Sequence, residues 1–295
     1  MKIGTRGSDL ARTQTGTIAD KIERSLGIKA EIEVIKTKGD IVTDRPLREL
    51  EGRGYFTKEL EEALLEGRID VAVHSFKDMP SQIPEGLTMA CVSEREDPAD
   101  LLIVKRNSYK PEMGKIPFSE NAVVGTSAVR RESQIKAIRD DLIIKDLRGN
   151  VPTRLRKLAA GLYDAIFLAS AGVRRLNLDL NDFDVVRLEP EDFVPSPGQG
   201  VLAIQMRISD PNIEPVKSII HNQDSYMATS IERDIMGRFG GGCGLSLGAY
   251  ACRKGDIWYA CGFWGGIEGK PKWANVTGED PSVLAEKLYD GLTHD

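Results

Sequence analysis

Hydrophobic and polar positions alternate between two patterns over the first two thirds of the chain. Short apolar runs typical of buried strands are followed by segments in which apolar residues recur every three or four positions, as in helices. The first such pair is a strand at residues 3–5 and a helix that Ser8 can cap and that ends near Leu26. This alternation predicts an α/β fold with mainly parallel sheets covered by helices.

The alternation forms two blocks of similar layout. In the first, the pattern predicts strands at residues 31–37 and 69–73 and a helix at 57–65. In the second, it predicts strands at 101–104, 123–124, 142–145 and 165–169 and helices at 129–138 and 153–160. Each block carries Gly-Thr before its first helix and Leu-x-x-Gly-x-x-Asp before a buried strand, ending at Asp70 and Asp164. The shared signature indicates two similar domains.

Two polar segments that contain proline or glycine, at residues 94–100 and 189–200, follow these blocks. A strand at residues 201–206 comes next, and a strand placed there could return to the first block. Two lobes joined by paired crossovers form a cleft that can open and close on a ligand. We therefore expect an active-site cleft between a first domain at residues 1–95 and 197–216 and a second domain at 99–193.

The last third of the chain has a different pattern. A largely helical stretch at residues 214–239 leads into a glycine-rich loop at 240–244. Strand-like runs and a final helix follow at residues 247–252, 257–263, 272–276 and 283–292. Consecutive strands with helices at both ends predict a small α+β third domain with an antiparallel sheet, at residues 217–295.

Composition and charge exclude several classes of protein. The 295 residues include 41% hydrophobic and 29% charged side chains, ordinary for a folded chain, and four cysteines are too few for a disulfide scaffold. With no basic leader and no apolar run of about 18 residues, we expect a cytoplasmic protein that is neither secreted nor membrane-bound. The net charge of −5 argues against a general nucleic-acid binder.

Arginines and hydroxyls recur at three predicted helix starts. Free N–H groups at a helix start, together with hydroxyl and guanidinium groups, bind carboxylates or phosphates well. The sets are Arg6 with Ser8, then Thr126, Ser127, Arg130 and Arg131, and finally Arg148, Gly149, Asn150 and Arg154. They could be unrelated capping sites, but three in one acidic chain favour a shared polyanionic small molecule.

Lys77 and Asp78 directly follow a buried strand that ends at His74 and Ser75. Ligands bind at the carboxyl ends of strands in open α/β sheets. Asp78 could accept hydrogen bonds from a ligand N–H or stabilise a cation, whereas the alternative is a local Lys–Asp surface pair of little consequence. His74 is more often a satisfied core histidine than a catalyst.

Cys243 stands in a glycine-rich run that cannot pack a core but can bring one side chain into a cleft. The functional interpretation is an exposed thiol used covalently, and the alternative is a flexible linker with an incidental cysteine. Cys91, Cys252 and Cys261 lie in apolar strand-like runs, which favours buried structural cysteines. The spacing of Cys243, Cys252 and Cys261 is not that of a zinc site, so no metal is expected.

Taken together, these segments resemble the hydroxymethylbilane synthase family, also called porphobilinogen deaminase. Any one matching run is weak, but the ordered set spans nearly the whole chain and is very specific. The runs lie at residues 3–8, 56–60, 70–80, 95–98, 125–131, 147–151, 197–200 and 241–243.

The resemblance implies two lobes like those of periplasmic-type binding proteins, with mixed sheets, and a third domain that carries a cysteine. That cysteine, matched by Cys243, would hold a dipyrromethane cofactor through a thioether. The implied enzyme is a monomeric transferase of haem and porphyrin biosynthesis. It joins four porphobilinogen molecules head to tail, releases ammonia at each step, and frees linear hydroxymethylbilane.

The resemblance also implies roles for individual residues. Asp78 matches the catalytic carboxylate, which would stabilise positive charge on a pyrrole nitrogen. The implied substrate or cofactor contacts are Arg6, Ser8, Lys77, Thr126, Ser127, Arg130, Arg131, Arg148, Gly149, Asn150, Arg154, Arg175 and Gln199. Two positions depart from the family pattern: Ser246 stands where proline is usual, and Ser196 stands where alanine is common.

Two other functions compete with this interpretation. A non-catalytic, two-lobed anion-binding protein would explain the arginines but would leave Cys243 unexplained. A nucleic-acid-binding protein would use the same arginines, but the net charge and the lack of interleaved aromatic and basic residues disfavour it.

Overall fold

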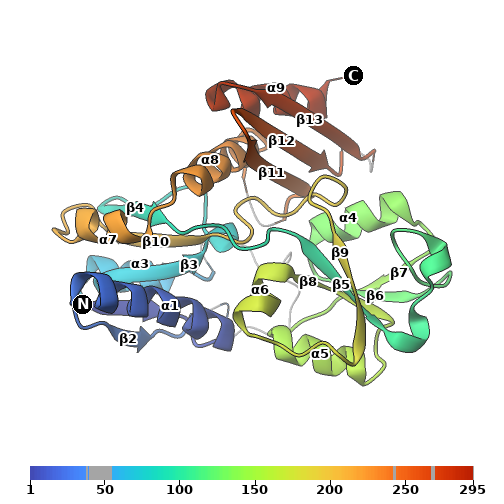
Figure 1. Cartoon of the computed structure of the whole chain (residues 1–295), viewed down its shortest axis with the longest axis horizontal. Helices are drawn as coiled ribbons and strands as arrows, with labels where there is room; N and C mark the ends of the chain where they lie inside the picture. The colour runs from blue at the N-terminus through green and yellow to red at the C-terminus, as the bar shows by residue number, and fades with distance from the viewer. Residues whose placement is uncertain (38, 40–54, 242–243, 267–269, 295) are drawn as a thin grey trace.

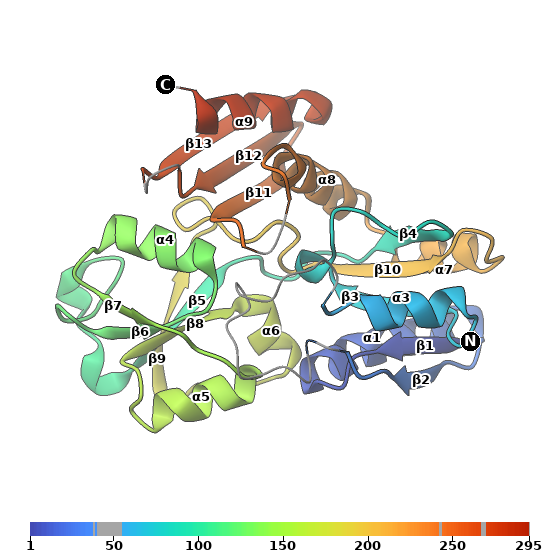
Figure 2. The ribbon, with the colours of Figure 1, turned by 180° about the vertical axis from the view of Figure 1, so that it is seen from behind.

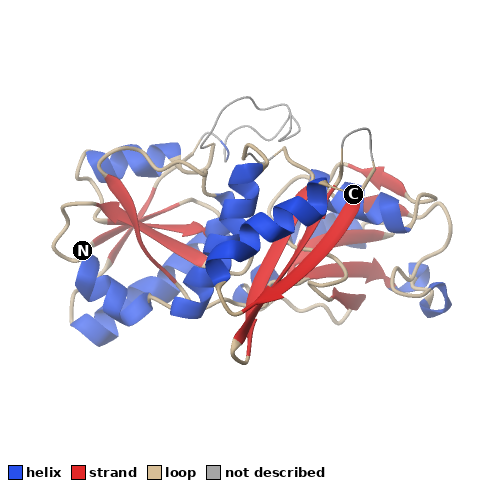
Figure 3. Ribbon diagram, turned by 90° about the horizontal axis from the view of Figure 1, so that it is seen from above, coloured by secondary structure: helices blue, strands red, loops and turns tan. Residues whose placement is uncertain are grey.

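The structure is a computed structural model, and it describes residues 1–37, 39, 55–241, 244–266 and 270–294. The described strands form two five-stranded sheets and one three-stranded sheet. Figure 1 shows the two larger sheets side by side, each with helices packed on it, and the small sheet above them. Seen from above in Figure 3, the small sheet and its helices lie over the junction of the two larger units. The predicted fold class, two α/β lobes with mixed sheets and a small α+β domain, is confirmed.

The first lobe consists of one five-stranded sheet, in the order β2-β1-β3-β10-β4, and the helices on its two faces. Strand β1 pairs in parallel with β2 and β3, whereas β10 runs antiparallel to both β3 and β4. The strands are β1 (Lys2–Thr5), β2 (Glu31–Val34), β3 (Val71–Ser75), β4 (Leu87–Val92) and β10 (Leu202–Arg207). The helices are α1 (Asp9–Leu26), α3 (Lys58–Leu65) and α7 (Ile213–Ile220).

Side chains of β3 alternate between two apolar layers of this lobe. Val71 and Val73 belong to the cluster that contains Ile18 and Ile22 of α1. Ala72 belongs to the opposite cluster, which α3 supplies with Leu60, Ala63 and Leu64. Because successive strand residues point to opposite faces, a strand with helices on both sides is apolar on both faces, as residues 71–73 are.

The second lobe repeats this plan in the order β7-β6-β8-β5-β9. Strand β6 pairs in parallel with β7 and β8, and β5 runs antiparallel to β8 and β9. The strands are β5 (Asp100–Lys105), β6 (Val123–Gly125), β7 (Ile143–Lys145), β8 (Ala165–Ala169) and β9 (Phe183–Leu188). The helices are α4 (Val129–Ile138), α5 (Val151–Ala159) and α6 (Ser170–Arg175).

The sequence signature shared by the two blocks has a structural counterpart in each lobe. Asp70 accepts a hydrogen bond from the backbone N–H of Lys2, and Asp164 accepts one from that of Val123, both at 2.8 Å. Each carboxylate therefore fixes the first residue of the equivalent strand, β1 or β6. The expectation of two similar domains is confirmed.

Two crossovers connect the lobes, one from β4 to β5 and one from β9 to β10. The second returns the chain to the first lobe, where β10 inserts between β3 and β4, as Figure 2 shows from behind. The predicted return of residues 201–206 to the first sheet is therefore confirmed. The domain boundaries themselves remain a prediction.

The third domain is an antiparallel sheet of β11 (Leu247–Lys254), β12 (Ile257–Trp264) and β13 (Lys272–Gly278). Helices α8 (Gln223–Arg238) and α9 (Leu284–Thr293) share one apolar cluster with this sheet. The helical stretch predicted at residues 214–239 is divided, because Asn222 caps α8 by accepting a hydrogen bond from Ser225 N at 2.8 Å. Helix α7, before the break, packs on α1 and β4 of the first lobe.

No described helix combines the length and apolar character needed to span a membrane. Within the same residues, no group of three or more histidine, cysteine, aspartate or glutamate side chains is arranged to hold a metal ion.

Candidate active site

The short turn after β3 presents two of the predicted site residues. It is a 3-10 turn, η2 (Phe76–Asp78), and the residues on either side of Lys77 and Asp78 are anchored in the core. Phe76 and Met79 are buried in one cluster with Val201, and Phe76 N donates to Val201 O at 2.9 Å. Lys77 and Asp78 are thereby held half-buried at the carboxyl end of β3.

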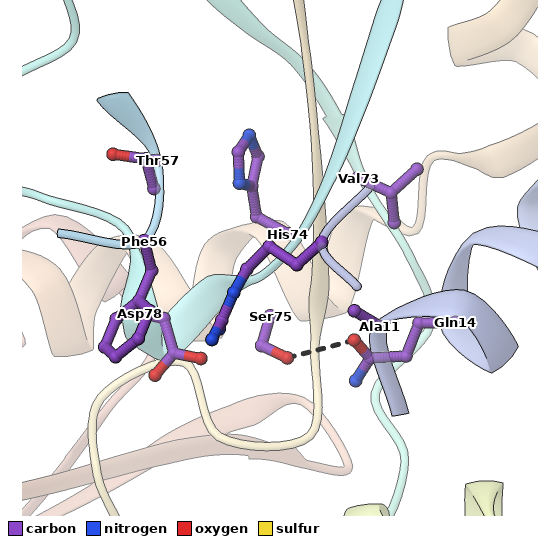
Figure 4. A pocket seen from close by; sticks show the side chains of 9 residues that line it. Ala11, Gln14, Phe56, Thr57, Val73, His74, Ser75 and Asp78 are labelled. Atoms are coloured by element: carbon purple, nitrogen blue, oxygen red, sulfur yellow. Dashed lines mark hydrogen bonds between the residues drawn. The ribbon is translucent and has the colours of Figure 1, made fainter. Parts of the chain in front are cut away.

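A pocket opens beside this turn, between the ends of β1 and β3 and the start of α1. Figure 4 shows Asp78, Ser75 and Gln14 around it, with Ser75 Oγ donating to Gln14 Oε1 at 3.1 Å. The Arg6 guanidinium lies 4.0 Å from the ring centre of Phe56. The pocket lining is Arg6, Ala11, Gln14, Phe56, Thr57, Val73, His74, Ser75 and Asp78.

His74 is a core histidine, as predicted. Its Nε2 lies 3.0 Å from Oε1 of Gln205 on β10, and burial lowers the pKa of the imidazole to about 4. Gln205 Nε2 in turn donates to Oε1 of buried Glu61 at 3.2 Å. Near neutral pH the imidazole is therefore uncharged. It is one member of a chain of hydrogen-bonded side chains that joins β3, β10 and α3.

Gln199 connects the η2 turn to the crossovers. Its side chain is 1% exposed, and its Oε1 accepts a hydrogen bond from Lys77 Nζ at 3.2 Å. Its Nε2 donates to Pro98 O at 2.7 Å and to Asp100 Oδ1 at 2.8 Å. Because Pro98 lies on the first crossover and Gln199 on the second, this side chain ties both crossovers to the turn.

Asp100 holds two of the predicted arginines. Arg130 Nη1 donates to Asp100 Oδ2 at 2.9 Å, and Arg131 donates through Nε and Nη2 to the two Asp100 oxygens at 3.1 and 2.8 Å. Burial opposes ionisation of Asp100, but the two guanidinium groups hold the pKa of its carboxyl far below the usual range. One carboxylate cannot neutralise two guanidinium groups, so the cluster keeps a net positive charge.

A third guanidinium group lies close to this cluster. Burial, together with the charges of Arg131 and Arg148, lowers the pKa of Arg154 to about 10. Arg154 Nε donates to Gly149 O at 2.8 Å, which aligns Arg154 with the loop before α5. Arg154 thus lies within the positive field of Arg131 and Arg148, and such a concentration of cations favours binding of an anion.

Lys77 belongs to the same electrostatic group. Burial lowers the pKa of its ammonium group to about 8, against the opposing effect of Asp78 and with a further lowering by Arg131. Lys77 donates to Gln199, which donates to Asp100, the partner of Arg131, so two hydrogen bonds link Lys77 of the first lobe to the arginine cluster of the second.

Several predicted contacts have structural partners of their own. Ser8 Oγ accepts from Ala11 N at 3.3 Å and Asn150 Oδ1 from Thr153 N at 3.0 Å, so both cap helices. The remaining pairs are Ser127 Oγ to Leu147 O at 2.8 Å, Ala128 N to Thr126 Oγ1 at 3.2 Å, and Arg175 Nη2 to Gly200 O at 2.6 Å. Their ligand contacts stay predictions, and Arg175 lies at the second crossover.

Cys243 lies outside the described residues. The chain that leads to it is described up to Gly241, and Gly240 and Gly241 have φ angles of 85° and 64°. Two consecutive left-handed residues strongly favour glycine, which accounts for the glycine-rich sequence before the cysteine.

The sequence patterns did not single out three residues of this region. Asp100 was missed because its partners lie 30 and 31 positions away on α4. Gln14 could have been found, because it lies three positions after Ala11 on α1 and therefore shares a helix face with it. Glu232 is fully buried on α8 beside apolar Ile231, and a lone acid on an apolar helix face is a usable signal.

Comparisons with known proteins agree on one family. Residues 1–215 match the family model described as "Porphobilinogen deaminase, dipyromethane cofactor binding domain". Porphobilinogen deaminase of Roseiflexus castenholzii is 40% identical over 297 residues, covering 98% of this chain and 96% of the relative. Porphobilinogen deaminase of Roseiflexus sp. is 42% identical, covering 98% and 94%, and the probable enzyme of Methanocella arvoryzae is 46% identical, covering 87% and 81%.

Among solved structures, the methionine-binding protein MetQ is similar at a TM-score of 0.47 and 12% identity. The match covers 79% of this chain and 94% of that one.

Proposed function

We propose that this chain, which belongs to the porphobilinogen deaminase family, is a transferase that joins four porphobilinogen molecules head to tail. Ammonia leaves at each condensation, and hydrolysis frees linear hydroxymethylbilane for tetrapyrrole biosynthesis. The observation that carries the proposal is the meeting of the Lys77–Asp78 turn with the arginine cluster of the other lobe. A carboxylate beside an excess of cations suits a substrate that has anionic side chains and develops positive charge at a ring nitrogen.

The arginines fit a ligand that carries several carboxylates. Each pyrrole unit brings two carboxylates, so a growing chain is a dense polyanion. Burial, and then the charges of Arg131 and Arg148, lower the pKa of Arg154, and carboxylates bound beside these arginines would offset that effect. We propose as contacts Arg6, Ser8, Lys77, Thr126, Ser127, Arg130, Arg131, Arg148, Gly149, Asn150, Arg154, Arg175 and Gln199.

The family model is that of a dipyrromethane-binding domain, and the positive charge around Arg131, Arg148 and Arg154 fits a group that carries carboxylates. We propose that Cys243 holds it through a thioether and that the arginines bind its carboxylates. When bound, this group supplies the pyrrole end to which the first porphobilinogen is joined.

Asp78 is the proposed catalytic carboxylate. Loss of ammonia and attack by the neighbouring pyrrole both place positive charge on a ring nitrogen, and a carboxylate held beside that N–H stabilises the charge where it develops. The anchored turn holds the carboxylate in place before the reaction begins. We propose that Asp78 also accepts a proton from the ring.

Lys77 and the crossovers support this carboxylate. An ammonium group with a pKa of about 8 is mostly charged at neutral pH and is a proposed partner for a substrate carboxylate. Gln199 links Lys77 to both crossovers, so the orientation of the Lys77 side chain depends on the position of one lobe relative to the other. We further propose a cytoplasmic monomer that acts on a small molecule without nucleic acid.

The test is stoichiometry of turnover. Protein is incubated with porphobilinogen, ammonia is measured directly, and the tetrapyrrole is measured as porphyrin absorbance after cyclisation and oxidation. We expect four ammonia molecules for each tetrapyrrole. Binding of porphobilinogen without ammonia release, by protein that carries its cofactor, would contradict the proposal and favour the anion-binding alternative.

A further inference from the structure

Two consecutive residues of α8, Glu232 and Arg233, connect the third domain to the rest of the molecule. The Glu232 carboxylate is fully buried and accepts three hydrogen bonds. The donors are Ala251 N at 2.8 Å, Gly198 N at 2.7 Å and Arg95 Nη2 at 2.7 Å. They belong to β11 and to the two crossovers, so Glu232 fixes α8 against the segments that join the lobes.

Arg233 reaches the turn that carries Asp78. Its Nη1 donates to Met79 O at 3.2 Å and its Nη2 to Pro80 O at 2.5 Å. Its guanidinium carbon lies 4.8 Å from the ring centre of Phe76. These three partners lie on both sides of Lys77 and Asp78 in the chain. Arg233 therefore holds the turn by contacts with the residues that flank the two functional ones.

Stability alone does not account for this arrangement. Burial lowers the pKa of Arg233, and none of the acidic side chains in the described ranges forms an ion pair with it. A desolvated guanidinium group without a carboxylate is costly, and an apolar side chain of similar length would pack there at no such cost. What an apolar side chain cannot supply is two directed hydrogen bonds to backbone carbonyls.

Helix α8 also leads to Cys243. The helix ends at Arg238, and the chain continues through Gly240 and Gly241, two residues before the cysteine. A Cβ placed on Gly241 would lie 3.2 Å from Ser81 Oγ, so Gly241 passes beside the residue that follows Pro80. The α8 segment and the Asp78 turn therefore touch at two places, Arg233 and Gly241.

We propose that Arg233 is a positioning residue that holds the turn carrying the Asp78 carboxylate in a fixed place against α8. This inference rests on the proposed function. The carboxylate lies on the turn that Arg233 holds, so a shift of this turn relative to α8 would move the carboxylate away from the ring nitrogen on which it is proposed to act. Misplacement by about 1 Å costs about 10²-fold in rate.

The experiment compares Arg233→Met, Arg233→Lys and the control Arg238→Met. Arg238 lies on the same helix but is exposed and pairs with Asp234 at 3.2 Å. For each cofactor-loaded protein, kcat, KM and the thermal midpoint are measured, and each pyrrole addition is followed by intact mass under single-turnover conditions.

For Arg233→Met we expect kcat to fall about tenfold to a hundredfold, with KM changed less than about threefold and the thermal midpoint unchanged. All four additions should slow alike, because the carboxylate that serves each of them is displaced. Arg233→Lys should recover part of kcat, since an ammonium group can still donate to both carbonyls. Arg238→Met should behave like the wild type.

Wild-type kcat in Arg233→Met would overturn the inference, as would an equal loss in Arg238→Met. If Arg233→Met does not fold, Arg233→Lys decides: an unchanged kcat with a lowered thermal midpoint would show a merely structural role. An inactive, cofactor-loaded wild-type chain would instead contradict the proposed function, and this inference with it. Active wild type with an unaffected Arg233→Met contradicts the inference alone.

Discussion

The two lobes share one scaffold but present different chemistry to the cleft. Each sheet has three parallel strands, then one antiparallel strand, and then an edge strand that runs parallel to the first three. Asp70 and Asp164 make the same hydrogen bond in each lobe. After β3 the first lobe forms the short η2 turn that carries Lys77 and Asp78. After β8 the second lobe enters α6 at once, and its cations come from α4 and the start of α5.

This difference indicates that the two lobes have different roles in the reaction. The first lobe supplies the carboxylate proposed to act on ring nitrogens, and the second supplies most of the guanidinium groups proposed to bind carboxylates. A duplicated fold thus supplies two unlike sets of functional groups, which together suit a substrate with acidic side chains around a ring N–H.

The comparison predicts its largest effect at Asp78. Asp78→Asn removes the charge but keeps the shape of the side chain, so kcat should fall by about 10³-fold while the fold is retained. The measurement is kcat of cofactor-loaded protein together with circular dichroism. Asp20→Asn, on the exposed face of α1 in the same lobe, is the control and should keep full activity. Wild-type turnover in Asp78→Asn with a normal spectrum would remove Asp78 from the catalytic role.

In the second lobe, the largest effect should be on stability. Asp100→Asn leaves Arg130 and Arg131 buried without a countercharge, so unfolding free energy should fall by about 3–5 kcal/mol. Asp141→Asn breaks the more exposed pair with Arg139 and should cost less than about 1 kcal/mol. Denaturant unfolding of both variants tests this, and equal losses would show that Asp100 is not the countercharge of the arginine cluster.

Acid should act on the same carboxylate. The folded-state pKa of Asp100 lies far below its unfolded value, so its contribution to stability is present above about pH 4 and is lost as pH falls below that. The stability difference between wild type and Asp100→Asn should therefore shrink as acid is added. A difference that stays constant from neutral pH to pH 3 would contradict this assignment.

A smaller effect is expected from Lys77, the cation of the first lobe. With a pKa of about 8, the ammonium group is charged below that pH and loses its charge above it, so KM should rise severalfold as pH increases through 8. In Lys77→Arg the inflection should disappear, because guanidinium stays charged. The pH profile of kcat/KM measures this, and an unchanged inflection in Lys77→Arg would assign it to another group.

The smallest effects should come from the two carboxylates that the lobes share, Asp70 and Asp164, and should be similar in size. Asp70→Asn and Asp164→Asn each weaken a hydrogen bond to the start of an equivalent strand, so each should cost about 1 kcal/mol of stability. Turnover at a temperature where both variants are folded should match the wild type. A large loss of kcat in only one of them would show that the scaffold itself is specialised.

Local patterns predicted much of this fold. Short stretches of sequence were enough to predict the helix caps at Ser8 and Asn150, the apolar helix faces and the strand that returns as β10. Strand β9 was not predicted, and β4 was recognised only as a strand-like run around Cys91. The helix predicted at residues 214–239 proved to be two helices, because the cap at Asn222 starts a new one.

The site was predicted less completely, for a physical reason. Motifs indicate which residues carry chemistry but not what they touch. The pairing of Asp100 with Arg130 and Arg131 and the grip of Arg233 on Met79 and Pro80 join segments far apart in the chain. Such contacts form only when the chain folds, and the pattern of apolar and polar residues within a short segment does not predict them.

The central claim is that Cys243 carries a covalent group built from the substrate. Intact mass of the purified protein under denaturing conditions, with a peptide map around Cys243, tests it most directly. The account predicts extra mass equal to two condensed pyrrole units on that cysteine, either as isolated or after incubation with porphobilinogen. A chain that remains unmodified after such incubation would contradict it.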